Sequence, residues 1–116
     1  MCVVDSSDLV LQYMVKNNLV TKQKIMEDMS YISNELVKEG VYSEIDFKYY
    51  NDEIISDMIT NNLWHFLSSN IIKKHRSELK YEITDFGKKI SSYLLSSFQE
   101  NETVWGKYNK IIDGLS

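Results

Sequence analysis

The apolar positions of the chain repeat with helical spacing in its longest segments. The clearest stripe follows the spacing i, i+4, i+7, i+11 and consists of Ile25, Met29, Ile32 and Leu36. Thr21 can cap the start of this helix, and Gly40 is suited to its end. The pattern therefore predicts an amphipathic helix from about Thr21 to Gly40.

A second helix is predicted nearer the N-terminus. Asp5, Ser6 and Ser7 offer capping side chains, and residues 9–15 are apolar almost all round. A helix that is apolar on several faces must be covered on several faces. At the edge of a small domain, we expect a second subunit to supply part of that cover.

Two further helices are predicted in the middle of the chain. Ser43 and Asp46 have the spacing of a capping box, which indicates a short helix from Ser43 to about Tyr50. Asn51 can cap the next helix, which should run to about Ser68. Its apolar stripe consists of Ile55, Ile59, Leu63 and Phe66.

A β-hairpin should follow, because residues 71–75 and 79–83 have strand patterns and residues 76–78 form a tight turn. Thr84 can cap a helix that extends to about Phe98, and a last amphipathic helix follows Asn101. The predicted fold class is mainly α with a small β-hairpin.

Composition limits the class of protein. A chain of 116 residues with 43% apolar residues is expected to form one domain. It has no run of 18 apolar residues, and Asp5 and Asp8 do not fit a secretory signal, so we expect a soluble, cytoplasmic protein without membrane contact. Because Cys2 is the only cysteine, we expect no internal disulfide and no thiolate metal site. We also expect no cofactor.

Charge is distributed unevenly along the chain. The formal net charge is −4, yet residues 69–89 contain six basic and three acidic residues. The acidic excess lies mainly between Glu39 and Asp57. A basic segment in an acidic chain can contact nucleic acid where the segment is presented on one element.

Residues 66–90 resemble the second half of a winged helix domain of the MarR and PadR type. The resemblance is carried by Tyr81-Glu82-Ile83-Thr84-Asp85-Phe86-Gly87, which is similar to the family ending Y-x-L-T-x-x-G. It implies a winged helix-turn-helix core over residues 21–98, with an N-terminal dimerisation helix in residues 1–20 and a C-terminal helix in residues 99–116. The architecture is also similar to the DNA-binding adaptors of tubulin-type plasmid or phage segregation systems.

Two assignments of the first half remain open. In the preferred one, the helix after Thr21 is the first of the core, the short helix at Ser43 is the second, and the helix after Asn51 is the recognition helix. In the other, the helix at Ser7 is the first and the helix after Thr21 is the second, which leaves a long insertion before recognition.

The resemblance assigns DNA contacts to two elements. The recognition helix would offer Thr60, Asn61 and Asn62 to base edges or phosphates, and the basic hairpin, or wing, would offer Lys73, Lys74, His75, Arg76 and Lys80 to phosphates. The alternative is an ordinary solvated helix face and a hairpin whose lysines prevent edge-to-edge aggregation. Asp52, Glu53 and Asp57 would repel phosphate and count against insertion into the groove.

Two apolar stripes outside the predicted core indicate a homodimer. They consist of Leu9, Val10, Tyr13 and Met14 near the N-terminus and of Trp105, Tyr108, Ile111 and Leu115 near the C-terminus. The alternative is that these stripes pack on each other within one subunit.

We therefore expect a dimeric, sequence-specific double-stranded DNA-binding protein that regulates transcription or serves in plasmid or phage segregation. His65 and His75 have no matching carboxylate pattern, so we expect no enzyme activity. The alternative function is a protein-interaction module that uses Trp64 and the acidic face and does not bind DNA.

Overall fold

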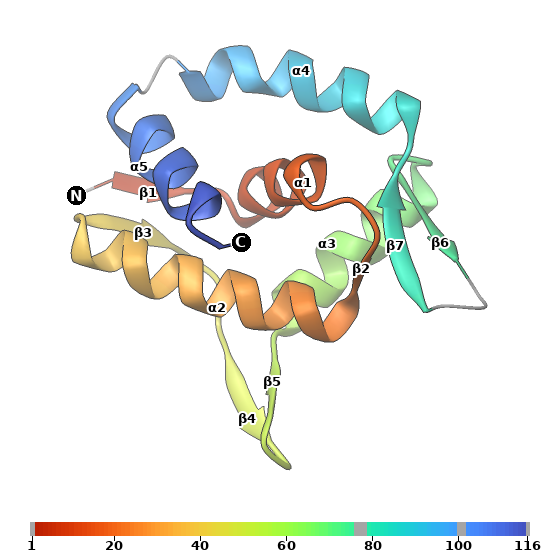
Figure 1. Cartoon of the computed structure of the whole chain (residues 1–116), viewed down its shortest axis with the longest axis horizontal. Helices are drawn as coiled ribbons and strands as arrows, with labels where there is room; N and C mark the ends of the chain where they lie inside the picture. The colour runs from red at the N-terminus through yellow and green to blue at the C-terminus, as the bar shows by residue number, and fades with distance from the viewer. Residues whose placement is uncertain (1, 76–78, 100–101, 116) are drawn as a thin grey trace.

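Five helices and three small β-sheets form the described part of the chain (Figure 1). The computed structural model describes residues 2–75, 79–99 and 102–115. The helices are α1 (Ser6–Lys16), α2 (Lys22–Lys38), α3 (Asp57–Ser68), α4 (Asp85–Gln99) and α5 (Glu102–Asp113). The class predicted from the sequence, mainly helical with a small β component, is confirmed in this coarse form.

The strands pair in three separate sheets. β1 (Cys2–Val4) lies parallel to β3 (Val41–Ser43). β2 (Val20–Thr21), β6 (Ile72–His75) and β7 (Lys80–Ile83) form an antiparallel sheet in the order β2-β7-β6. β4 (Lys48–Tyr50) and β5 (Glu53–Ile55) form an antiparallel hairpin between α2 and α3.

The first two helices begin where the sequence indicates. The Asp5 side chain accepts a hydrogen bond from the backbone N–H of Ser7, and the Thr21 hydroxyl accepts one from the N–H of Lys24. Each contact satisfies one of the donors that an α-helix leaves unpaired in its first turn. α1 and α2 therefore confirm the two capping predictions.

The short helix predicted from Ser43 to Tyr50 is wrong. That stretch ends β3 and forms β4, and the chain then reverses at Asn51 and Asp52, whose φ angles are +50° and +65°. Positive φ at both central residues is the geometry of a two-residue hairpin turn. As a result, α3 is capped by Ser56 rather than by Asn51, and the preferred assignment loses its second helix.

α1 is the central helix of the fold, with the other helices around it (Figure 1). The side chains of Leu9, Val10, Tyr13 and Met14 are all 0% exposed. On α5, Tyr108 is also fully buried, and its hydroxyl donates a hydrogen bond to the carbonyl of Leu9. The two terminal helices thus pack together within one chain.

This packing corrects the predicted dimer surface. The α1 stripe lies in the interior of a single chain, where a second subunit does not reach it. Ile111 and Leu115 are half-buried against the same core, and the side chain of Trp105 lies outside the described residues. The described members of both stripes are therefore buried or half-buried, and they do not form the exposed apolar surface that was predicted.

None of the helices in the described part of the chain is long and apolar enough to cross a membrane.

Candidate nucleic-acid interface

α3 presents one face to the core and one to solvent. Ile59, Leu63 and Phe66 are buried, as their spacing predicted. On the outer face, Asp57 and Asn61 are exposed and Trp64 is 64% exposed. The His65 ring meets Trp64 edge-on, with 5.4 Å between the ring centroids. An indole left this open to water is costly unless a partner covers it.

Two of the three polar side chains expected to contact DNA are used inside the protein. The Thr60 hydroxyl donates to the carbonyl of Ser56 at 3.0 Å, within the first turn of α3. The Asn62 amide donates to the hydroxyl of Ser6 at 3.1 Å and so connects α3 to α1. Asn61 is the one of the three that lies exposed on the outer face.

The β6–β7 hairpin carries the predicted basic side chains, and one carboxylate offsets part of their charge. Lys73 Nζ and His75 Nε2 both reach Glu82, at 3.6 and 2.7 Å. The hydrogen bond from His75 is the main cause that lowers the pKa of the Glu82 carboxyl, and the charge of Lys73 adds to it. Lys73 lies at the surface, where water screens its pair with Glu82 and leaves its charge available to a partner.

The remaining wing residues lie beside this cluster. Lys74 is exposed and lies over the ring of Tyr81, 5.7 Å from its centroid. Lys80 is half-buried and pairs with His75 across the two strands. Arg76 lies outside the described residues.

The motif that carried the family resemblance has a clear structural role. The Thr84 hydroxyl lies 2.9 Å from the carbonyl of Ile71 and accepts a hydrogen bond from the N–H of Gly87 at 2.9 Å. It therefore closes the sheet and caps α4, as predicted. A Cβ atom on Gly87 would lie 2.1 Å from the carbonyl oxygen of Ile71, so only glycine fits.

Lys22 belongs to the same surface, although it is not among the residues that the sequence predicted to bind DNA. Lys22 is the first residue of α2. Together with α3 and β7 it borders a shallow hollow, which is lined by Lys22, Thr60, Leu63, Trp64, Leu67 and Tyr81. A lysine in the first turn opposes the helix dipole. That unfavourable placement is the sequence signal that marks Lys22 as a candidate binding residue.

The acidic residues are placed differently from the prediction. Asp52 and Glu53 lie on the β4–β5 hairpin and not at the start of α3. Asp57 remains at the first position of α3, where Lys48 Nζ lies 3.6 Å from its carboxylate. The start of α3 therefore carries less uncompensated negative charge than the sequence implied.

No family model, curated protein or solved structure matches this chain. The site must therefore be interpreted from its own geometry. Within the described residues, no three His, Cys, Asp or Glu side chains are grouped so that they could hold a metal ion.

Proposed function

We propose that this protein binds double-stranded DNA as a winged helix, with α3 as the recognition helix and the β6–β7 hairpin as the wing. The observation that carries the proposal is the pairing of β2 with β7. It joins the strand between α1 and α2 to the hairpin after α3. With β1 and the segment from β3 to β5 set aside, the elements from α1 to β7 follow the order helix, strand, helix, helix, strand, strand. This is the chain order of a winged helix, and it favours the second of the two assignments.

In this arrangement the segment from β3 to β5 is an insertion between the second helix and the recognition helix. α1 is then part of the winged core, not an added dimerisation element. The insertion leaves the buried face of α3 unchanged, since Ile59 and Leu63 still pack on the core. The outer face of α3 stays accessible beside the wing.

The proposed contacts come from three elements. Lys22 on α2 and the wing lysines would contact phosphates on either side of α3. Asn61 would read base edges, and Trp64 would make an apolar contact such as that with a thymine methyl group. The proposal leaves two roles open, transcriptional regulation and plasmid or phage segregation, and it includes no catalytic step.

Fluorescence anisotropy with duplex DNA at about 50 and about 200 mM salt tests the proposal. We expect binding at the lower salt that weakens at least about tenfold at the higher salt, because several phosphate contacts release counterions. The double variant Lys73→Ala, Lys74→Ala should bind the DNA weakly at both salt concentrations.

The matched control is Lys38→Ala with Lys110→Ala, which removes the same charge from exposed positions on α2 and α5. It should bind like the unmodified protein. Absence of binding at the lower salt, or equal losses in the two double variants, would contradict the proposal.

A second candidate function rests on the exposure of Trp64, which is 64% accessible next to the acidic Asp57. A protein partner that covers this indole would use the same face of α3 without DNA. Only the DNA-binding proposal requires Lys73 and Lys74, so the same double variant separates the two.

A further inference from the structure

The β4–β5 hairpin extends away from the body of the protein (Figure 1). Its strands pair in register from Lys48 opposite Ile55 to Tyr50 opposite Glu53, so only Asn51 and Asp52 form the turn. Ile54, the middle residue of β5, lies opposite Tyr49, is half-buried and packs against the core. The hairpin is therefore a regular projection that is fixed to the domain.

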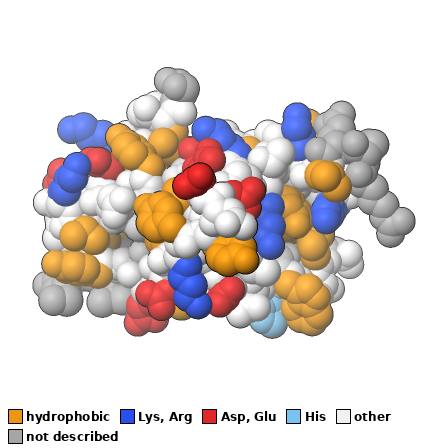
Figure 2. Space-filling view, turned by 90° about the horizontal axis from the view of Figure 1, so that it is seen from below, with side chains coloured by type: hydrophobic (Ala, Val, Ile, Leu, Met, Phe, Trp, Pro, Cys, Tyr) orange, Lys and Arg blue, Asp and Glu red, His pale blue; other side chains and the backbone are white. Residues whose placement is uncertain are grey.

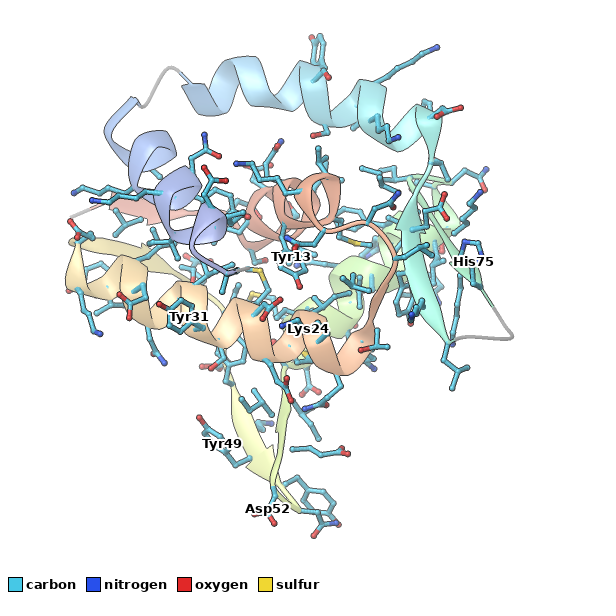
Figure 3. The ribbon with its side chains drawn as sticks, in the orientation of Figure 1. Tyr13, Lys24, Tyr31, Tyr49, Asp52 and His75 are labelled. Carbon is cyan, nitrogen blue, oxygen red and sulfur yellow. The ribbon has the colours of Figure 1, made fainter. Side chains whose placement is uncertain are left out.

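This projection carries exposed aromatic and acidic side chains. Tyr49 is 74% exposed and Tyr50 is 68% exposed, and Asp52 and Glu53 are exposed beside them. Figure 3 shows Tyr49 directed away from the domain and Asp52 at the tip. In Figure 2, hydrophobic and acidic side chains lie together on the face from which the β4–β5 hairpin extends. Because successive side chains of a strand point to opposite faces, Tyr49 and Tyr50 expose an aromatic ring on each face of the hairpin, and such exposed rings on a projection are suited to contact a partner.

Its charge is the opposite of that on the wing. Within the hairpin, residues 48–55, Asp52 and Glu53 outnumber Lys48, and the three acidic residues Glu44, Asp46 and Asp57 flank it in the sequence. The described part of the wing and the start of α4 carry an excess of positive charge. They contain two acidic residues, Glu82 and Asp85, and five lysines: Lys73, Lys74, Lys80, Lys88 and Lys89. The chain therefore bears two projecting hairpins of complementary charge.

The two hairpins leave the domain on different sides, one below α2 and the other beside α3 (Figure 1). The β4–β5 hairpin of one molecule is thus free to meet the wing of another. Asp52 and Glu53 would approach lysine ammonium groups, while the tyrosine ring on the contacting face of the hairpin would cover the aliphatic stems of the lysines or bind their ammonium groups.

We propose that two copies of this chain associate reciprocally, each placing its β4–β5 hairpin on the wing of the other. A two-fold axis makes both contacts equivalent and closes the assembly as a dimer. The buried terminal helices are not needed for it. The inference stands without DNA binding, but the two are linked, because a wing covered by the acidic hairpin is not open to phosphate.

The dimer should be weak and sensitive to salt, since its charged groups are exposed and the two contacts are small. Sedimentation velocity at about 20 and about 300 mM salt measures this directly. We expect dimer at the lower salt and an increase of at least about tenfold in the dissociation constant at the higher.

Two charge-reversed variants give the decisive test. Asp52→Lys with Glu53→Lys makes both hairpins basic, and Lys73→Glu with Lys74→Glu makes both acidic. Each variant alone repels itself and should be monomeric. In an equal mixture, the basic β4–β5 hairpin of the first meets the acidic wing of the second, and the reverse contact has unmodified charges. The mixture should therefore form heterodimers.

The control Glu35→Lys with Glu39→Lys makes the same change in net charge at the far end of α2, and it should dimerise like the unmodified protein. Thermal unfolding of each variant checks that it is folded. The proposal is overturned if the unmodified protein is monomeric at low salt, or if the folded variants fail to associate when mixed. DNA binding is measured on the same samples, so its failure is seen separately.

Discussion

The hydroxyl of Tyr13 on α1 donates a hydrogen bond to the carboxylate of Asp28 on α2. Asp28 is only 6% exposed, and the ammonium group of Lys24 lies 3.0 Å from its other oxygen. Figure 3 shows Tyr13 and Lys24 approaching the same space between the two helices. Burial, together with the hydrogen bond and the charge of Asp28, raises the pKa of Tyr13 far above its ordinary value. The raised pKa keeps the hydroxyl protonated at neutral pH, so that it can donate to Asp28.

Replacing Tyr13 with Phe should lower the free energy of unfolding by about 1–3 kcal/mol, because it leaves a buried carboxylate oxygen without its donor. Urea denaturation measures the difference. The matched control is Tyr31→Phe on α2, where the ring is 49% exposed and the change should be within about 0.5 kcal/mol. Equal effects of the two substitutions would show that the hydrogen bond to Asp28 does not stabilise the fold.

Gly87→Ala should be strongly destabilising. Its Cβ would lie 2.1 Å from the carbonyl oxygen of Ile71 and 2.7 Å from Cγ1 of Ile83, so α4 must move away from the sheet. We expect a loss of about 3 kcal/mol or more in the free energy of unfolding.

Gly106→Ala on α5 is the control for this substitution, because nothing lies within 4 Å of its Cβ position. Alanine is the better helix former, so this variant should gain about 0.5–1 kcal/mol. Thermal unfolding of both variants gives the comparison, and a Gly87→Ala protein as stable as the unmodified one would contradict the close packing of α4 on the sheet.

Local sequence signals predicted helix starts and the junction between sheet and helix correctly where they depend on neighbouring residues only. Asp5 and Thr21 cap their helices, and Thr84 and Gly87 join the sheet to α4 as their types predicted. Ser43 misled the prediction, because its capping-box spacing also fits a strand whose hydroxyl lies 3.1 Å from that of Ser33. The better signal was the Asn51-Asp52 pair between two segments rich in tyrosine and isoleucine.

The partners of a side chain depend on long-range packing, which the sequence does not state. Thr60, Asn61 and Asn62 are similar in polarity, yet Asn62 is held by Ser6, which lies 56 positions earlier in the chain. The same reason explains why the predicted dimer interface was wrongly placed on the terminal helices. An apolar stripe on α1 shows that the helix is covered, but it does not distinguish α5 of the same chain from a second subunit.

The hydrogen bond between His75 and Glu82 should make stability depend on pH. Because folding lowers the pKa of Glu82, its contribution is complete above the ordinary value of 4.5 and is lost as the pH falls through the lower value of the folded state. The unmodified protein should therefore melt at a higher temperature than Glu82→Gln at about pH 6, and the two should converge towards about pH 3. Glu44→Gln, an exposed substitution, should not reproduce the difference.

Lys22 should contribute one phosphate contact. The binding constant for duplex DNA falls as salt rises, and its logarithm is plotted against the logarithm of the salt concentration. The slope of that plot should become shallower by about 0.9 in Lys22→Ala. Lys38→Ala at the other end of α2 should leave the slope unchanged. A salt slope identical in the two variants would remove the start of α2 from the proposed interface.

The turn of the β4–β5 hairpin should be improved by glycine. Asp52 has a φ of +65°, which is unfavourable for a residue with a side chain. Asp52→Gly should raise the free energy of unfolding by about 0.5–1 kcal/mol, and Asp52→Val should lower it by about 1–2 kcal/mol. Both substitutions remove the same charge, so their difference isolates the backbone effect. Because Ile54 packs on the core, the turn is coupled to global unfolding, and urea denaturation should detect it. Equal stabilities for the two variants would mean that residues 51 and 52 do not form this turn in solution.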